Sequence, residues 1–419
     1  MSPSIFKKQK IINDPVYGFI RIDDPVVFRV IEHPGYQRLR RIQQMALAHL
    51  VYPGAVHTRF QHSLGAYHLL SLALQELKNK GISISAGEET AVKLAVLLHD
   101  AGHGPFSHAL EGQIVAGMPH EQISRLLMKQ LIMDVDGPLE MALSIFDHTY
   151  PRPFLHQLVS SQLDVDRMDY LMRDSFYTGV AEGIIGYDRI LKMLTVADDE
   201  LMVEEKAIYS IEKFIIARRL MYWQVYLHKT VLSAETMLQK IIQRARELAL
   251  QGISVPSSPA LQFFLTLQNP ADYPPSEWLP LFCQLDDVDV LMAIKTWSTH
   301  SDPVLSWLSR ALLNRQLFRL KLSPHPFDQL SISRLQQECL RQFPFLQEDT
   351  LHYFVYTGTA SSYAYNPTDE NIRIISGQHR IRDISEVENS LINHTVSIPI
   401  KKFYICYPKS LTGQFYEPL

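Results

Sequence analysis

Residues 91–112 read AVKLAVLLHDAGHGPFSHALEG, and this stretch decides the fold. Its first eight residues are apolar around most of the helical circumference, so we expect a helix that is buried on nearly all sides. That helix ends in His99-Asp100. Burying an unpaired carboxylate costs on the order of several kcal/mol. The polar pair therefore requires a partner elsewhere in the chain.

The turn that follows this helix adds more imidazole groups. Gly102, Gly104 and Pro105 end the helix, and we expect the turn to bring His103 and His108 back toward the same cleft. A single histidine at this place would be explained by its favourable interaction with the helix dipole. Three histidines and an aspartate within ten residues instead indicate a functional site.

An upstream stretch, VYPGAVHTRFQHSLGA at residues 51–66, places three polar side chains before a long helical pattern. Because Arg59 and His62 are about one helical turn apart, we expect them to act together. His57 has no evident partner in the sequence. We therefore expect His57 only to fix the Pro-Gly turn.

A downstream stretch, LDVDRMDYLMRDS at residues 163–175, carries carboxylates at helical spacing. Asp166, Tyr170 and Asp174 follow each other at intervals of four and share one face. Asp169 and Arg173 form a second pair at this spacing, which we interpret as an ordinary ion pair. Asp166 faces inward beside Leu and Met, so it needs a partner.

These segments together predict a metal site. Its two imidazoles and two carboxylates are those of His62, His99, Asp100 and Asp166. A mixed nitrogen and oxygen set suits one divalent ion, namely Mn, Fe, Ni or Zn, or else Mg. Such an ion lowers the pKa of a bound water and polarises a phosphoryl oxygen.

Other side chains suit the chemistry of a phosphate ester. Imidazole has a pKa suited to a general acid, and the candidates are His103, His108 and His120. A pattern of about forty residues with no internal Pro or Gly, residues 210–252, predicts one long helix. One face of it carries Arg218, Tyr222, Tyr226 and Lys229, with His228 close by. The apolar flank LMYWQVYL favours the wall of an anion pocket over a solvated basic stripe.

Composition excludes several classes of protein. The chain has 419 residues, 46% of them hydrophobic, and its 40 basic and 44 acidic residues give a net charge of -4. This balance does not favour binding to nucleic acid or an anionic membrane. The three cysteines are far apart and odd in number, so a disulfide framework is not expected. This usage is typical of a protein in a reducing compartment. No signal peptide or membrane-spanning segment is evident, so we expect a cytoplasmic protein.

The pattern along the chain predicts a mainly α fold in four parts. Residues 1–23 form an N-terminal β-hairpin segment, and residues 24–250 a catalytic helical core. Residues 251–323 are a helical extension. Residues 324–419 are rich in β-branched and aromatic runs, which predict a small α+β C-terminal module that serves as an assembly or lid element.

The order His62, His99-Asp100, Asp166 resembles the signature of the HD superfamily of metal-dependent phosphohydrolases. Seven ordered segments are more similar to one branch, the dGTPases and SAM-and-HD-domain dNTP triphosphohydrolases. They are INDPVYGFIRI, YQRLRRIQQM, PGAVHTRFQHSLG, LLHDAGHGPFSHALE, PHEQ, LDVDRMDYLMRD and ARRLMYWQVYLHKT. The resemblance covers residues 9–235 and implies the HD-domain fold for the helical core.

The resemblance implies cleavage of a dNTP at the α-phosphorus, by a metal-activated water, to the deoxynucleoside and inorganic triphosphate. His108 would be the acid, with His103 and His120 close by and Glu121 supporting His120. The implied phosphate contacts are Arg59 for the α-phosphate and Arg167 and Arg218 for the β- and γ-phosphates. Gln44 and Asp174 would bind the 3'-hydroxyl, and Tyr170 and Tyr226 would pack on the deoxyribose.

Two departures from the family pattern concern phosphate binding and regulation. Arg167 stands where related enzymes often carry lysine, and Trp223 and Gln224 stand where regulated vertebrate relatives carry basic residues. Those relatives are homo-oligomers, so we expect a dimer or tetramer, and they bind an activating guanine nucleotide between subunits. The matching positions here are Lys10, Ile11, Glu32, Gln37 and Arg40. A hairpin and helix with a purely structural role would explain these residues equally well.

Two other functions stay open. A different HD phosphohydrolase would act on GTP, a nucleoside monophosphate or a cyclic nucleotide, and a nucleotide-sensing module would keep the metal ligands without turnover. Binding to nucleic acid through Arg38, Arg40 and Arg41 is the weaker alternative, because the net charge is negative.

Overall fold

The computed structural model describes residues 10–362, 371–377, 380–387 and 400–411. The chain starts with an antiparallel hairpin of β1 (Lys10–Asp14) and β2 (Gly18–Ile22). Asp14 accepts hydrogen bonds from the backbone N–H groups of Val16 and Tyr17, and this closes the turn. The predicted N-terminal hairpin is confirmed.

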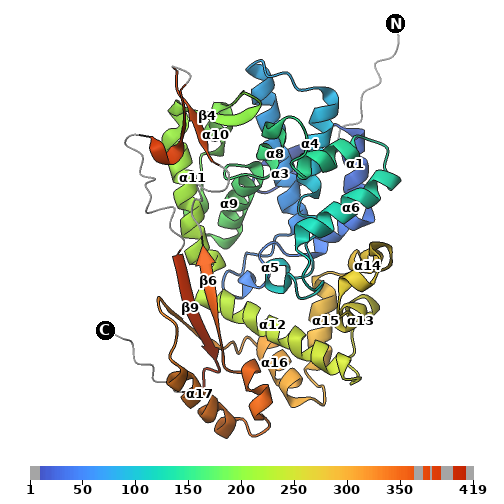
Figure 1. The fold of residues 1–419 in the computed structure, drawn as a ribbon, viewed down its shortest axis with the longest axis vertical. Helices are drawn as coiled ribbons and strands as arrows, with labels where there is room; N and C mark the ends of the chain where they lie inside the picture. Colours follow the sequence, from blue (N-terminus) through green and yellow to red (C-terminus); the bar gives the residue numbers. More distant parts are fainter. Residues whose placement is uncertain (1–9, 363–370, 378–379, 388–399, 412–419) are drawn as a thin grey trace.

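A layer of helices follows and fills most of the core. These are α1 (Pro25–Glu32), α2 (Pro34–Gln37), η1 (Arg38–Arg41), η2 (Ala48–Leu50), α3 (Arg59–Asn79), α4 (Ala86–Leu98), α5 (Ser107–Leu110), α6 (His120–Asp134), α7 (Leu139–Phe146), α8 (Pro153–Val159), α9 (Val165–Thr178), η3 (Ala181–Gly183) and α10 (Tyr187–Met193). Figure 1 shows α3 deep in this half of the molecule, where it packs against α4 and α9. The expected helix that ends at His99 is confirmed as α4, with Val92 to Leu98 buried.

The predicted single long helix is wrong. The chain forms α11 (Ile208–Met221), a π-helical turn η5 (Tyr222–Tyr226) and α12 (Lys229–Leu250). The break occurs because His228 leaves the helix and its side chain accepts a hydrogen bond from Thr230 N–H, which caps α12. Lys229 is consequently exposed and does not continue the face of Arg218 and Tyr226.

The expected helical extension packs against α12. It consists of α13 (Pro259–Thr266), η6 (Pro270–Asp272), α14 (Pro275–Phe282), α15 (Asp287–Trp297) and α16 (Pro303–Leu313). Trp278 and Trp297 are fully buried in this group. A second helical group thus closes the lower side of the molecule in Figure 1.

The strands form two further sheets that cross the expected domain boundaries. A four-stranded sheet has the order β3 (Leu194–Ala197), β4 (Glu200–Glu204), β7 (Arg373–Ile375), β8 (Ile381–Asp383), and β4 and β7 are parallel. A three-stranded antiparallel sheet has the order β5 (Arg319–Ser323), β9 (Ile400–Tyr407), β6 (Tyr356–Ser362). The remaining elements are η4 (Glu205–Ala207), α17 (Gln329–Gln342), η7 (Glu348–Tyr353) and η8 (Ile384–Glu386).

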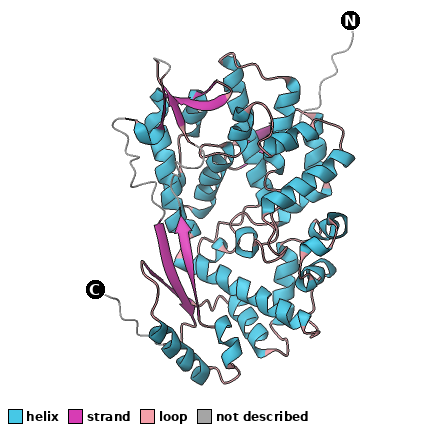
Figure 2. Cartoon of the chain, viewed as in Figure 1, coloured by secondary structure: helices cyan, strands magenta, loops and turns pink. Residues whose placement is uncertain are grey.

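The predicted small α+β module at the C-terminus is present as α17, β6 and β9, but its sheet includes a strand from before residue 324, and two other C-terminal strands join the sheet of the catalytic half. β7 and β8 extend a hairpin of the catalytic half, whereas β6 and β9 pair with β5, which precedes the expected boundary at residue 324. Helices nevertheless dominate (Figure 2), so the mainly α fold is confirmed. Within the described residues, every helix is too short or too polar to cross a membrane.

Candidate active site

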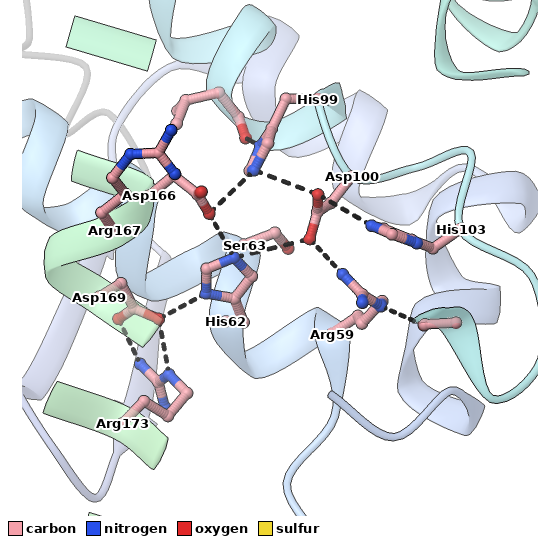
Figure 3. Close-up of polar contacts among 12 residues, drawn as sticks. Arg59, His62, Ser63, His99, Asp100, His103, Asp166, Arg167, Asp169 and Arg173 are labelled. Atoms are coloured by element: carbon pink, nitrogen blue, oxygen red, sulfur yellow. Dashed lines mark hydrogen bonds and ion pairs between the residues drawn. The ribbon is translucent and has the colours of Figure 1, made fainter. Parts of the chain in front are cut away.

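Four side chains from three helices meet in one cluster (Figure 3). Thr58 and Gln61 cap α3, so His62 lies in its first turn. His99 and Asp100 follow the last residue of α4, and Asp166 lies in the first turn of α9. One ligand atom from each of the four lies within 4.8 Å of the others. The structure thus brings together all four predicted metal ligands.

Distances within the cluster show how tightly the groups converge. Asp166 Oδ1 lies 2.8 Å from His62 Nε2 and 3.1 Å from His99 Nε2. Asp100 Oδ1 lies 3.3 Å from His99 Nε2, and Asp100 Oδ2 lies 3.6 Å from His62 Nε2. His62 and Asp100 are buried, and the Asp166 side chain keeps 22% of its surface exposed. The cluster therefore has one side open to a ligand.

The electrostatic field of the cluster favours a cation. Burial opposes charge on both rings, yet Asp166 and Asp169 raise the pKa of His62 to about 10, and Asp100 and Asp166 raise the pKa of His99 to about 9. Against the effect of burial, the histidines hold the pKa of Asp166 far below its ordinary range. A carboxylate pair with two imidazoles is a donor set that suits a divalent first-row metal. The residues present fit such an ion.

A buried ion pair lies behind His62 and orients it. Asp169 Oδ2 lies 2.7 Å from His62 Nδ1, and the same carboxylate accepts from Arg173 Nε and Nη2. Arg173 also donates to Asp14. The predicted ion pair between Asp169 and Arg173 is present, but it is not the ordinary solvated or partly buried pair that we expected, because both side chains are fully buried. A Cβ at position 65 would lie 1.9 Å from Asp169 Oδ1, so Gly65 permits this close packing.

The three histidines of the following turn lie next to the cluster. His103 Nε2 is 3.4 Å from Asp100 Oδ1, and the His103 ring stacks on His120 with centroids 3.7 Å apart. Burial and then Arg59 hold the pKa of His103 well below its ordinary value. His108 is 68% exposed and lies with its ring centroid 5.1 Å from that of His103.

A carboxylate that sequence reasoning missed supports these histidines. Glu111 Oε1 lies 2.6 Å from His120 Nδ1, whereas the predicted partner, Glu121, lies 3.5 Å from His120 Nε2. Glu111 Oε2 also lies 3.6 Å from His108 Nδ1. The only signal in the sequence was its position three residues after His108, one turn of helix away.

The three predicted phosphate-binding arginines keep donors available. Arg59 pairs with Asp100 and Ser107, and its buried Nη2 has no hydrogen-bond partner among the described residues. Arg218 donates from Nη1 to Gln162, and its Nε is likewise without a partner in the part of the chain that the structure describes. Arg167 donates from Nε to Ser161 O at 2.7 Å and keeps 24% of its side chain exposed.

A cavity of ≈ 340 Å³ contains the predicted sugar-binding side chains. Its lining residues are Gln44, Met45, Ala46, Ala48, His108, Tyr170, Asp174, Tyr222, Tyr226, Leu227, Val231 and Glu235. The Tyr170 and Tyr226 rings lie edge to face with centroids 6.2 Å apart. Sequence reasoning did not single out Glu235 or the apolar members of this lining.

Asp174 is held from two sides at the cavity wall. It accepts a hydrogen bond from Tyr226 Oη at 2.7 Å, and its other oxygen lies 2.7 Å from His57 Nε2. His57 also stacks on Tyr177. The expectation that His57 only fixes the Pro-Gly turn was wrong, because its buried ring reaches across 117 residues of sequence to orient Asp174.

The residues expected to contact an activating nucleotide lie at the hairpin and the helices after it. Gln37 Oε1 accepts a hydrogen bond from Arg40 Nε, and Lys10 Nζ lies over the ring of Phe28. Ile11 and Glu32 are exposed. The structure brings Gln37 and Arg40 together, and a role for this set in activation stays a prediction.

The three arginines of residues 38–41 differ in burial and in their partners. Arg38 is fully buried and donates to the backbone oxygens of Ala101 and Leu285. Arg41 is paired with Asp286. Of these three guanidinium groups, only that of Arg40 lies free of backbone and carboxylate partners within the described residues, and it donates to Gln37 Oε1.

Comparison with known proteins identifies the family of the chain. The HD domain family matches residues 59–174, and the HD associated region matches residues 185–254. A crystal structure of a phosphohydrolase from Bacteroides thetaiotaomicron has a TM-score of 0.91 at 49% sequence identity and covers 96% of this chain and 100% of that chain.

Two curated relatives are similar over part of the chain, and one of them has a named activity. An uncharacterized protein of Bacillus subtilis is 34% identical over 320 residues, which are 74% of this chain and 72% of the relative. The deoxynucleoside triphosphate triphosphohydrolase SAMHD1 of Homo sapiens is 31% identical over 282 residues, which are 56% of this chain and 44% of the relative. The chain thus spans less than half the length of the relative whose activity is named.

Proposed function

We propose that this chain, which belongs to the HD-domain phosphohydrolase family, hydrolyses deoxynucleoside triphosphates to the deoxynucleoside and inorganic triphosphate. Its membership makes it a hydrolase with a His/Asp cluster that can hold a metal. One observation supports the finer proposal. Asp166, Tyr170 and Asp174 follow one another along α9, so the cluster and the ≈ 340 Å³ cavity lie in sequence along one helix face.

The cationic side chains suit a triphosphate. Arg59 and Arg218 have buried guanidinium nitrogens without partners among the described residues, and Arg167 is partly exposed. Guanidinium groups bind phosphate oxygens through paired N–H donors. We assign Arg59 to the α-phosphate and the other two to the β- and γ-phosphates, and Arg167 in place of lysine offers a planar fork rather than a point charge.

The proposed reaction balances as a hydrolysis. Water adds its oxygen to the α-phosphorus, the bond from phosphorus to the 5'-oxygen breaks, and a proton passes to that oxygen. His108 lines the cavity and is the proposed donor of the proton. A divalent metal held by His62, His99, Asp100 and Asp166 would supply Lewis acidity toward the phosphate and a water of lowered pKa.

The cavity wall fits a deoxyribose. Asp174 and Gln44 present oxygens to the 3'-hydroxyl, and the Gln44 Oε1 atom is buried without a partner among the described residues. The crossed rings of Tyr170 and Tyr226 leave little room for a 2'-hydroxyl. The close approach of these two rings is the part of the proposal that favours a deoxynucleotide over a ribonucleotide such as GTP. We also propose that a guanine nucleotide activates the chain, that it assembles as a homo-oligomer and that it is located in the cytoplasm.

Product analysis tests the proposed function. The purified chain is incubated with each dNTP and with GTP, under Mn, Mg or Ni, with and without a second nucleotide. We expect inorganic triphosphate and deoxynucleoside in equal amounts, and loss of this turnover in Asp166→Ala. The matched control is Asp188→Ala, an exposed aspartate of α10. Release of only monophosphate or pyrophosphate would indicate another HD phosphohydrolase, and tight binding without turnover would indicate a nucleotide sensor.

A further inference from the structure

Glu235 occupies an unusual position in the active-site cavity. It lies on α12 four residues after Val231, and both side chains line the cavity. Burial raises the pKa of Glu235 to about 8. No hydrogen bond or ion pair stabilises this carboxyl group within the described ranges of the chain. An acid in this state is costly to keep unless a ligand supplies the missing partner.

Two other polar atoms of the same cavity are also unpartnered. Gln44 Oε1 and Tyr170 Oη are buried and make no hydrogen bond to any described residue. Buried polar atoms in folded proteins are almost always paired. Two such atoms, together with the partly buried Glu235 carboxyl, around one space of ≈ 340 Å³ indicate that a polar ligand completes the site.

The rest of the wall suits the faces of a flat ring. The apolar side chains of this lining are Met45, Ala46, Ala48, Leu227 and Val231. Asp174 and the two tyrosines are assigned to the sugar, so the base of the same nucleotide must extend into the remaining part of the cavity. There its faces meet apolar side chains, and Glu235 is the acidic group left to contact its edge.

We propose that Glu235 reads the base edge of the bound deoxynucleotide and selects guanine, an inference that rests on the proposed function. A carboxylate offers two adjacent acceptors. Guanine is the only one of the four bases with two adjacent donors, at N1–H and the exocyclic amino group, whereas the other bases interrupt their donors with acceptors. These donors stabilise the ionised carboxyl, so guanine supplies the partners that the protein does not.

Substrate profiling of Glu235→Gln tests this assignment. The amide keeps the size of the side chain, but its NH₂ group replaces one carboxylate oxygen. This NH₂ donor would face an N–H donor of guanine, so one hydrogen bond to the base is lost. We expect kcat/KM for dGTP to fall roughly 10- to 100-fold, while kcat/KM for dATP stays within about threefold or rises. The wild-type chain should prefer dGTP over the other three dNTPs. The unfolding temperature of the variant should stay equal or rise, because a partly buried acid without a protein partner is removed.

A control separates base reading from damage to α12. Glu247→Gln changes another carboxyl of the same helix, outside the cavity lining, and should leave the ratio of dGTP to dATP unchanged. An equal fall for all four substrates, or no preference for dGTP in the wild type, would overturn the assignment while leaving the proposed function intact.

Failure of the proposed function gives a different result. If the wild-type chain releases no triphosphate from any dNTP, the stabilisation of the Mn-loaded chain by dGTP and by dATP is measured by thermal unfolding. A larger shift with dGTP that disappears in Glu235→Gln would still support base reading. Equal shifts in both proteins would overturn it.

Discussion

His62 has a different carboxylate at each ring nitrogen. Asp169 accepts from Nδ1, so the second nitrogen, Nε2, faces Asp100 and Asp166. Such a contact fixes the tautomer and orientation of a metal-binding histidine. In Asp169→Asn, one acceptor becomes a donor that faces Arg173. We expect the affinity for Mn²⁺ to fall roughly 10- to 100-fold, measured by calorimetric titration of the metal-free chain.

Excess metal distinguishes this positioning role from general damage. If Asp169 only orients His62, saturating Mn²⁺ should restore most of kcat in Asp169→Asn, and Asp188→Asn should bind the metal like the wild type. Unchanged Mn²⁺ affinity, or a loss of kcat that metal does not restore, would contradict the role.

Residue types and spacing predicted that His62, His99, Asp100 and Asp166 meet in one cluster, because each lies in a distinctive local pattern. His57 and Asp169 have roles that depend on partners more than one hundred residues away. No periodicity in the sequence pairs His57 with Asp174. For Asp169 the ion pair with Arg173 was visible at helical spacing, but its complete burial against α3 and the hairpin was not.

At the scale of elements, the N-terminus of α15 holds two segments of the active site. Asp287 is buried and accepts from the backbone N–H groups of Gln43 and Phe106, at 2.8 and 2.7 Å. Gln43 precedes Gln44 of the cavity wall. Phe106 has a φ of +49°, in the left-handed region, and begins the turn that carries His108. Asp287, a residue of the second helical group, therefore fixes the backbone conformation of two segments in the first helical group.

Removing that acceptor should affect stability and catalysis together. Asp287→Ala leaves the buried N–H group of Phe106 unsatisfied, at a cost of about 1–3 kcal/mol, and also removes the acceptor of the partly buried Gln43 N–H. We expect a lower free energy of unfolding in urea and a lower kcat/KM for dNTPs. The control is Asp289→Ala, which removes only the cap of α15 at Asp286 N–H. It should lose stability but keep kcat/KM, and equal activity of the two variants would contradict the role of Asp287.

Secondary structure was predictable where local chemistry determines it. Ser85 and Glu88, for example, form a capping box at the start of α4. The break between α11 and α12 was missed because it contains neither Pro nor Gly, and it depends on the His228 cap. The β3–β4 hairpin was also missed. Its turn uses Asp198 and Asp199 with positive φ, which aspartate tolerates, but a short hairpin among helices leaves a weak pattern.

At the scale of the molecule, the fold class followed from the dominance of helical periodicity, whereas the domain boundaries did not. Strand pairing between β4 and β7 joins residues about 170 positions apart, and such non-local register leaves no trace in one sequence. The consequence is functional. β9 and β6 pack behind α12, where Cys406 lies beside Ser233 and Tyr356 Oη donates to Thr236. Ser233 and Thr236, which flank Glu235 on α12, therefore contact the C-terminal sheet.

A chain that ends after Val355 should consequently lose both stability and activity. Seven large side chains that it lacks are buried: Ile372, Ile374, Ile384, Val387, Ile405, Tyr407 and Leu411. Each contributes about 1.5–3 kcal/mol, and their sum is comparable with a typical net stability of about 5–15 kcal/mol. We expect calorimetry to show no cooperative transition near that of the intact chain, and no dNTP hydrolysis. Lys401→Ala, on the exposed face of β9, should behave like wild type. A truncated chain that unfolds within a few degrees of the intact chain and still turns over dNTPs would show that the sheet does not support α12.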